Sequence, residues 1–264
     1  MVMPPTPPAL FTLEFRKQMA RLSSRQRHEW LASLAFELGG VDSADRVRAQ
    51  ELREVARGCR LSLVESVSRH LGPFDDRYLR ALLEVPRERF VRPSDIERSA
   101  DDNPLPLDST GLATISAPHA YLLSFRILAL QPRDALVELG TGSGYGAALA
   151  AFIVGPSGRV LTFEIDPGLV DWARRTLSHD PNVTVVEADA VTSAQHWRGA
   201  SKVVVTFGID AWPQAWLDAL PEGGKIVAPL GTGDQRLVLA ERRRGQIVES
   251  DHGAVRYVRN RSER

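Results

Sequence analysis

The chain has 264 residues, which is long enough for one large domain with an appendage or for two smaller domains. Hydrophobic residues make up 43% and charged residues 25% of the sequence, as in ordinary globular proteins. The 33 basic and 33 acidic side chains balance, so the net charge argues against a general binder of nucleic acid or of anionic membranes.

The start of the chain and its cysteine content indicate where the protein works. Residues 1–10, MVMPPTPPAL, lack the charged segment and the long apolar core of a signal peptide. No stretch contains the ~18 apolar residues that a transmembrane helix needs. The single cysteine, Cys59, cannot form an internal disulfide, and its place in a helical pattern predicts a small buried side chain. We therefore expect a soluble cytoplasmic protein without nucleic-acid or membrane partners.

Helices are predicted over the first third of the chain. Apolar residues recur at helical spacing from Trp30 to Leu38 and again from Val47 to Val67. A further short helix is predicted at Asp75–Val85.

The first half of the chain also contains a basic segment and a proline-rich segment. Residues 11–30 hold five basic side chains against two acidic ones, which indicates a solvated helix face or, as the alternative, a docking surface. Residues 86–118 contain five prolines and no clean periodicity, and long ordered loops of this kind are often functional. We predict a helical N-terminal extension over residues 1–80 and a main domain over residues 81–264, with 86–118 as its acceptor loop.

From residue 134 onward, short apolar runs rich in β-branched residues alternate with helical stretches. The predicted strands are 135–139, 159–164, 183–186, 202–207 and 224–230. The predicted helices between them are Tyr145–Val154, Leu169–Leu177 and Trp212–Leu220. This alternation predicts an α/β fold with a parallel sheet covered by helices on both faces. Residues 236–250 and 254–260 look like strands with no helix between them, which predicts an antiparallel edge.

Three glycines, Gly140, Gly142 and Gly144, follow the first of these strands and open a helix. Glycine lets the backbone turn sharply and approach a ligand, and the helix N-terminus offers unpaired N–H groups. Glu164 ends the next strand, 24 residues beyond Gly140, where a carboxylate can accept both hydroxyl hydrogens of a ribose. The pattern predicts a nucleoside cofactor bound across the loop, which includes Thr141.

The residues leave the kind of cofactor open. Gly142, Gly144 and Ala147 also satisfy the dinucleotide pattern G-x-G-x-x-A, and a purely structural glycine turn is a further alternative. Glu138 favours a cationic sulfonium such as S-adenosylmethionine, because its negative charge would repel a pyrophosphate. Asp189, just after the third strand, is placed to accept a hydrogen bond from an adenine amino group.

Two blocks of sequence carry a family resemblance. The segment PLPLDSTGLATISAPH, residues 104–119, precedes VELGTGSGYGAALAA, residues 137–151. LEVPRERFV, residues 83–91, and LPEGGKIVAPLG, residues 220–231, extend the likeness. Over roughly residues 61–258, the chain resembles the protein-L-isoaspartate O-methyltransferase family.

The resemblance implies a class I methyltransferase fold, a Rossmann-like and mostly parallel seven-stranded sheet. It also implies methyl transfer from S-adenosylmethionine to the side-chain carboxylate of an isoaspartyl residue in a peptide or protein, with S-adenosylhomocysteine as product. The family's active-site serine corresponds to Ser116, and Thr114, which we expect among the cofactor-binding residues, would line the gap between donor and acceptor. Glu164 matches the ribose-binding acid, and Ala188 and Asp189 match the family's Gly-Asp-Gly near adenine.

Residues around this block are expected on the acceptor side. We expect the acceptor to contact Ile115, His119, Tyr121 and Arg259. Ser116 would donate a hydrogen bond that orients the acceptor carboxylate, or would cap a helix that starts at Pro118. We expect no metal, because no second His, Cys or acidic residue lies at a metal-like spacing from His119.

The acceptor side departs from the family pattern. Asp108–Ala113 is a longer spacer than usual, FGIDAWP carries the bulky Phe207 and Trp212, and Arg259 places a cation near the expected peptide site. These departures leave three functions open. They are isoaspartyl repair, carboxylate methylation of an Asp in a precursor peptide or of a small acid, and cofactor binding without turnover, with Phe207 and Trp212 filling the pocket.

Overall fold

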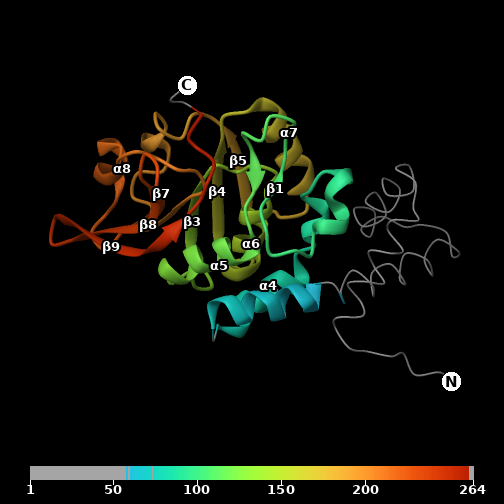
Figure 1. Cartoon of the computed structure of the whole chain (residues 1–264). Coiled ribbons are helices and arrows are strands. Elements are labelled where there is room, and N and C mark those ends of the chain that lie inside the picture. The colour runs from blue at the N-terminus through green and yellow to red at the C-terminus, as the bar shows by residue number, and fades with distance from the viewer. Residues whose placement is uncertain (1–57, 59, 73, 262–264) are drawn as a thin grey trace, which may run out of the picture. The chain divides into compact units, whose positions relative to one another are not determined.

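The structure is a computed structural model that describes residues 58, 60–72 and 74–261 (Figure 1). The helix expected from Trp30 to Leu38, the basic segment at 11–30 and Cys59 lie outside the described residues. Of the predicted helical extension, residues 1–80, the structure describes the part from residue 58 onward, except residues 59 and 73.

The chain divides into two compact units. The first comprises Met1–Leu105 together with Ala117–His119, and the second comprises Pro106–Ser116 together with Ala120–Arg264. The division thus falls inside the segment 86–118.

Helices make up most of the secondary structure described in the first unit. They are a helix over residues 60–71, α4 (Asp76–Glu84), and the 3-10 helices η1 (Arg87–Arg89) and η2 (Pro93–Arg98). The Asp75 carboxylate caps α4 by accepting a hydrogen bond from the backbone N–H of Arg77 at 2.9 Å. The short helix predicted at Asp75–Val85 is confirmed, one residue shorter at each end.

The guanidinium of Arg87 orders the proline-rich segment of the first unit. This residue is only 1% exposed, and it donates hydrogen bonds to three backbone carbonyl groups. The acceptors are Ser99 at 3.1 Å, Asp101 at 2.8 Å and Asn103 at 2.7 Å. The neighbouring Glu88, also buried, pairs with Arg60. Because buried charges are costly unless they are paired and hydrogen-bonded, these contacts hold a segment that has no regular strand or long helix.

The second unit contains a seven-stranded sheet (Figure 1). Its strands lie in the order β5-β4-β3-β6-β7-β8-β9. They are β3 (Ala135–Leu139), β4 (Arg159–Glu164), β5 (Val183–Glu187), β6 (Lys202–Val205), β7 (Lys225–Leu230), β8 (Gln235–Arg243) and β9 (Gln246–Val255). The pairs from β5 to β7 are parallel, whereas β7–β8 and β8–β9 are antiparallel. The predicted α/β fold, mostly parallel with an antiparallel C-terminal edge, is confirmed. Two short strands, β1 (Leu105–Pro106) and β2 (Thr114–Ile115), form a separate small sheet.

Helices cover both faces of the large sheet. They are α5 (Pro118–Ile127), α6 (Tyr145–Val154), α7 (Pro167–Thr176), the 3-10 helix η3 (Ala194–His196) and α8 (Gln214–Ala219). α6 packs on β3 and β4, α7 packs on β4 and β5, and α8 packs against η3. Right-handed crossovers place α6 and α7 on one face, and α8 on the other because the chain changes direction across the sheet at β6. None of the described helices is long and apolar enough to cross a membrane.

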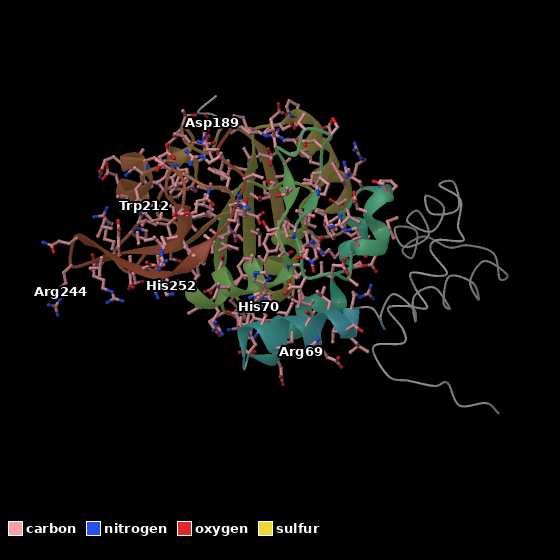
Figure 2. All side chains as sticks on the ribbon, viewed as in Figure 1. Arg69, His70, Asp189, Trp212, Arg244 and His252 are labelled. Atoms are coloured by element: carbon pink, nitrogen blue, oxygen red, sulfur yellow. The ribbon has the colours of Figure 1, made fainter. Side chains whose placement is uncertain are left out.

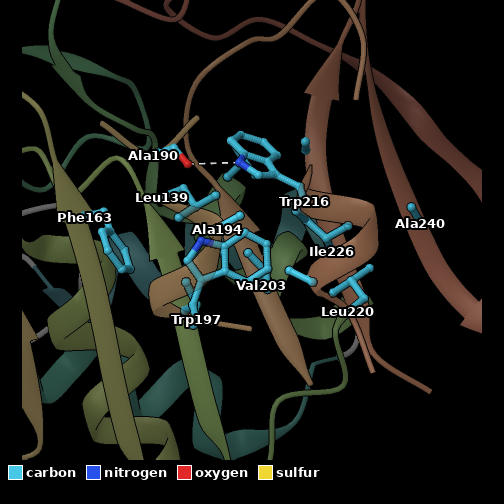
Figure 3. Packing of buried hydrophobic residues seen from close by; sticks show 14 of the residues in the cluster. Leu139, Phe163, Ala190, Ala194, Trp197, Val203, Trp216, Leu220, Ile226 and Ala240 are labelled. Atoms are coloured by element: carbon cyan, nitrogen blue, oxygen red, sulfur yellow. Dashed lines mark hydrogen bonds between the residues drawn. The ribbon is translucent and has the colours of Figure 1, made fainter. Parts of the chain in front are cut away.

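The apolar core on the α8 face is built around Trp216 (Figure 3). Its side chain is fully buried, and its indole N–H donates to the carbonyl oxygen of Ala190 at 3.0 Å. Alternate residues of β3, Val137 and Leu139, belong to this core. Because successive side chains of a strand point to opposite faces, Glu138 between them points to the α6 face.

The C-terminal edge differs from the expectation in where its strands begin and end. Residues 236–250, expected as one strand, belong to two strands because the chain reverses at Arg244 and Gly245. Both turn residues have positive φ, 52° and 76°, as a two-residue type I′ hairpin turn requires. Only the first two residues of the predicted strand 254–260 belong to β9.

Candidate active site

A cleft opens in the second unit at the carboxyl ends of β3, β4, β5 and β6. The strand order reverses between β3 and β6, and open α/β sheets bind ligands in the crevice at such a switch point. The space between atoms in the cleft, together with the open solvent at its mouth, is about 680 Å³. Ten of the predicted site residues line it: Thr114, Ile115, Tyr121, Gly140, Thr141, Gly142, Glu164, Ala188, Asp189 and Arg259.

The predicted glycine loop forms part of the cleft wall. Gly140 has a φ of 98°, which residues with a side chain rarely adopt, and a Cβ there would lie 2.9 Å from Cδ1 of Phe207. The backbone N–H of Gly142 donates to Oε2 of Glu164 at 2.8 Å. Gly144 precedes α6 with a φ of 97° and does not line the cleft. Two of the predicted glycines therefore reach the ligand surface, and the third shapes the turn into the helix.

Glu164 presents its carboxylate to the cleft from the end of β4. Its Oε1 accepts hydrogen bonds from the backbone N–H groups of Ile165 at 3.0 Å and Asp166 at 3.1 Å. Burial raises the pKa of Glu164, and the backbone hydrogen bonds partly offset this shift. A carboxylate can accept up to about four hydrogen bonds. The backbone bonds therefore orient the group and leave capacity for a ligand hydroxyl.

Ala188 and Asp189 line the cleft just beyond β5 (Asp189 is labelled in Figure 2). Oδ1 of Asp189 accepts a hydrogen bond from the backbone N–H of Val191 at 2.8 Å. The Ser193 hydroxyl donates to the carbonyl oxygen of Asp189. These bonds hold the turn that brings the Asp189 carboxylate to the cleft.

Glu138 does not line the cleft, although the sequence placed it among the cofactor-binding residues. Its side chain lies under α6, where a Cβ added to Gly146 would clash with the Glu138 carboxylate. Burial and then the nearby Glu164 raise the pKa of Glu138 to about 8, while a hydrogen bond from Thr162 lowers it. The expectation that a negative charge on Glu138 selects a sulfonium is not supported, because the carboxyl is covered and mostly protonated at neutral pH.

A short chain of hydrogen bonds connects Glu138 to the cleft. The Thr162 hydroxyl donates to Oε2 of Glu138 at 2.7 Å, and the hydroxyl oxygens of Thr141 and Thr162 lie 2.6 Å apart. All three side chains are buried, and of the three only Thr141 lines the cleft. Glu138 therefore affects the cleft through two hydroxyl groups and has no direct contact with it.

The predicted acceptor residues divide between the cleft and its surroundings. Thr114, Ile115 and Tyr121 line the cleft, whereas Ser116 is buried and does not. The backbone N–H of Ser116 donates to the Tyr121 hydroxyl at 3.1 Å. His119 belongs to the first unit and does not line the cleft.

Arg259 and Arg261 line the cleft, and each forms ion pairs with aspartate side chains. The guanidinium of Arg259, predicted as a cation at the peptide site, pairs with Asp210 and donates to backbone carbonyl groups. The guanidinium of Arg261 donates to Asp108 at 2.7 Å and to Asp166 at 2.6 Å. Arg261 thus connects the segment before β2 to the start of α7.

The bulky residues Phe207 and Trp212 do not fill the cleft. Phe207 lines one wall, and Trp212 (labelled in Figure 2) is not among the lining residues. Both pack against the core cluster, where the Phe207 ring meets the Trp216 ring edge-on at a centroid distance of 6.3 Å. The cleft therefore remains open beside them.

Sequence reasoning missed several lining residues. Ile165 is 39% exposed, which is unusual for a large apolar residue, and it follows Glu164 directly. Thr206 lies just after β6. Their position at strand ends was a usable signal, because the carboxyl ends of parallel strands meet at one edge. Arg261 had no such signal, since it follows the last strand by several residues.

Comparison with known proteins places the chain in a family. Residues 61–264 match the family model described as Protein-L-isoaspartate(D-aspartate) O-methyltransferase (PCMT). A protein-L-isoaspartate O-methyltransferase from Methanopyrus kandleri is 37% identical over 212 residues, covering 78% of this chain and 92% of the relative. One from Methanocella arvoryzae is 37% identical over 177 residues, covering 66% of this chain and 93% of the relative.

Solved structures agree on the fold. A protein-L-isoaspartate O-methyltransferase gives a TM-score of 0.69 at 24% identity, covering 76% of this chain and 65% of that one. A structure from Plasmodium falciparum with the same family name, in complex with S-adenosyl-L-homocysteine, gives a TM-score of 0.67 at 22% identity, covering 76% and 97%. With its residues 61–264 matched by the family model, this chain belongs to the protein-L-isoaspartate (D-aspartate) O-methyltransferase family.

Proposed function

We propose that this protein transfers a methyl group from S-adenosylmethionine to the side-chain carboxylate of isoaspartyl residues in proteins or peptides. The observation that carries this proposal is that Glu164 and Asp189 line the same switch-point cleft as Thr114 and Ile115. Family membership supports the same reaction.

The cleft residues fit the donor. Glu164 would accept a hydrogen bond from a ribose hydroxyl group, Asp189 would accept one from the adenine amino group, and Ile165 would pack against the purine. Gly140 and Gly142 line the cleft with positive φ, so the turn of the loop beside the donor depends on glycine. When bound, S-adenosylmethionine supplies an electrophilic methyl group on a sulfonium, and S-adenosylhomocysteine is its product.

Methylation of a carboxylate needs no proton transfer to or from the acceptor. A carboxylic acid with a solution pKa of about 4 is ionised at neutral pH, so the chain need not supply a general base. What the chain supplies is position, and holding reactants in line contributes on the order of 7–11 kcal/mol in favourable cases.

Two hydroxyl groups of residues 108–116, the acceptor segment, are our candidates for orienting the incoming carboxylate. Thr114 lines the cleft, and Ser116, which the resemblance implies as the active-site serine, lies two residues further along. We assign orientation of the acceptor to both, Thr114 by direct contact and Ser116 from the end of the same segment. A lost hydrogen bond to a charged group costs about 1.5–3 kcal/mol, so each variant, Thr114→Val or Ser116→Ala, should lower kcat by roughly tenfold to a hundredfold.

The controls separate chemistry from folding. Ser109→Ala changes an exposed serine of the same segment that does not line the cleft, and it should leave kcat unchanged. Donor affinity should stay within about twofold in Ser116→Ala, because Ser116 is not assigned to the donor. Equal losses of kcat and donor affinity in Ser116→Ala would show that this serine is only structural.

The reaction itself is tested with methyl-labelled donor and three acceptors: an isoaspartyl peptide, the same peptide with ordinary aspartate, and small organic acids. We expect base-labile methyl ester on the isoaspartyl peptide alone. Ester on the aspartyl peptide or on a small acid would instead establish a specialised carboxylate methyltransferase. Donor binding without transfer to any acceptor would establish a binding protein without turnover.

A further inference from the structure

Two histidines and a buried aspartate meet within the first unit, in a cluster formed by His70, Asp102 and His119. His70 lies near the end of the helix over residues 60–71 (labelled in Figure 2), and His119 lies at the start of α5. One ligand-type atom from each side chain lies within 4.8 Å of the others. The sequence indicated no metal partner for His119, because its two neighbours are 49 and 17 residues upstream.

Asp102 is the centre of the cluster. Its Oδ1 lies 3.0 Å from Nδ1 of His119, and its Oδ2 lies 3.8 Å from Nδ1 of His70. The backbone N–H of His119 also donates to Oδ1 at 3.0 Å, which fixes the direction of the carboxylate. The side chain of Asp102 is only 7% exposed, compared with 26% for His119 and 58% for His70. The backbone of His119 thus holds the Asp102 carboxylate in place, and the two imidazole rings are more exposed to solvent than the carboxylate is.

The separations between these side-chain atoms are close to those between the ligands of a metal ion. Ligand atoms about 2.0–2.2 Å from a tetrahedral zinc ion lie roughly 3.3–3.6 Å from one another. The observed separations of 3.0 and 3.8 Å lie on either side of that range. Two neutral imidazoles and one carboxylate are also a donor set that divalent transition metals prefer, and they leave a coordination position for water.

We propose that His70, Asp102 and His119 form a binding site for a divalent transition-metal ion of the zinc class. The two imidazole rings stack with centroids 4.3 Å apart and an angle of 26° between their planes. Ligation needs the lone pairs of both rings to converge, so one ring must tilt on binding. The His70 ring has the room to do so, since it is the most exposed of the three side chains.

The bound ion would cross-link three segments that are distant in sequence. It would connect the helix over residues 60–71 to the loop at Asp102 and to the first turn of α5. His119 follows Ser116 by three residues, so the ion would also restrain the chain next to the acceptor segment. The site uses none of the cleft residues, and the proposal therefore stands apart from the proposed methyl transfer.

The test is titration of the full-length, tag-free protein with Co²⁺, read from its visible absorption, followed by displacement with Zn²⁺. We expect saturation at one ion per chain and loss of the Co²⁺ absorption when Zn²⁺ is added. Loss of an outer partner of a metal ligand costs about tenfold to a hundredfold in affinity. Loss of a ligand itself should therefore weaken binding at least about a hundredfold in His70→Ala and in Asp102→Asn.

His252→Ala is the matched control, because His252 is an exposed histidine on β9 in the second unit. It should bind Co²⁺ as the unaltered protein does. Circular dichroism of each variant checks folding, and His70→Ala is the decisive variant because its side chain is mostly exposed. The proposal fails if the unaltered protein shows no saturable Co²⁺ absorption, or if His70→Ala and Asp102→Asn bind as tightly as the control.

Discussion

Glu138 is 1% exposed, and its burial is the main cause that raises the pKa of its carboxyl group from 4.5 to about 8. Between pH 4.5 and about pH 8, the Glu138 carboxyl group is protonated in the folded protein and ionised in the unfolded chain. The free energy of unfolding must therefore fall as pH rises from about 4.5 to about 8, by at most about 1.4 kcal/mol per pH unit from this group. The buried acid makes the protein less stable toward alkaline pH.

Replacing this acid with its amide should remove that dependence. In Glu138→Gln we expect a flatter decline of the unfolding free energy between pH 5 and pH 8, because the amide has no proton to lose and still accepts a hydrogen bond from Thr162. Urea unfolding at several pH values measures both slopes. Equal slopes in the two proteins would mean that Glu138 is charged in the folded state.

Gly146 of α6 lies so close to Glu138 that there is no room for a side chain at this position. A Cβ at Gly146 would lie 2.6 Å from Cε1 of Tyr121 and would clash with the Glu138 carboxylate. We expect Gly146→Ala to lower the free energy of unfolding by about 1–3 kcal/mol, despite the better helix propensity of alanine.

Gly233→Ala is the control for this packing effect. A Cβ at Gly233 meets nothing within 4 Å, and its φ is not positive. Its unfolding free energy should change by less than about 0.5 kcal/mol in the same urea experiment. A neutral Gly146→Ala would show that α6 can shift away from Glu138.

At the scale of elements, Arg261 connects two segments that border the cleft. Its guanidinium bonds Asp108, in the segment that leads to β2, and Asp166, which caps α7. Asp108 in turn accepts hydrogen bonds from the backbone N–H groups of Thr110 at 3.0 Å and Leu112 at 3.2 Å. Arg261 therefore holds the acceptor segment, through Asp108, next to the N-terminus of α7.

Removing the Arg261 guanidinium should weaken ligand binding. Partly exposed ion pairs contribute up to about 1 kcal/mol, so Arg261→Ala should weaken S-adenosylhomocysteine binding roughly fivefold. Calorimetric titration measures the affinity. Arg236→Ala removes an exposed pair with Asp251 on the β8–β9 hairpin, away from the cleft lining, and should bind normally. Similar effects in both variants would rule out a specific role for Arg261.

At the scale of the whole molecule, every residue that lines the cleft belongs to the second unit. A ligand that binds only the folded state stabilises it by about 2.7 kcal/mol at a concentration of 100 Kd. S-adenosylhomocysteine at that concentration should therefore raise the melting temperature of the protein by roughly 5–10 °C. Glu164→Ala should lose most of this rise at the same ligand concentration. An unchanged melting temperature for the unaltered protein would contradict the proposed donor site.

Much of the fold was predictable from local patterns. The bounds of β3, β4 and α6 are those expected from the sequence, because period-two and helical spacings act over a few residues. The hairpin at Arg244 was missed, because Arg244-Gly245 is not one of the residue pairs that strongly indicate a two-residue turn.

The site was predictable in part. Glu164 could be placed in the cleft, because the end of a strand beside a glycine loop has a known location in open α/β sheets. Glu138 could not, although it is two residues from Gly140. Its direction depends on which face of the sheet α6 covers, and that is a property of packing.

The sequence alone determined the alternation of strands and helices from β3 to β7, the glycine turn and the acid that follows it, because these depend on the spacing of neighbouring residues. Only the tertiary structure decided that Glu138 is covered by α6, that Arg261 joins Asp108 to Asp166, and that His70 and Asp102 meet His119. The physical reason is that contacts between residues far apart in the chain depend on how complete elements pack. No local spacing contains that information.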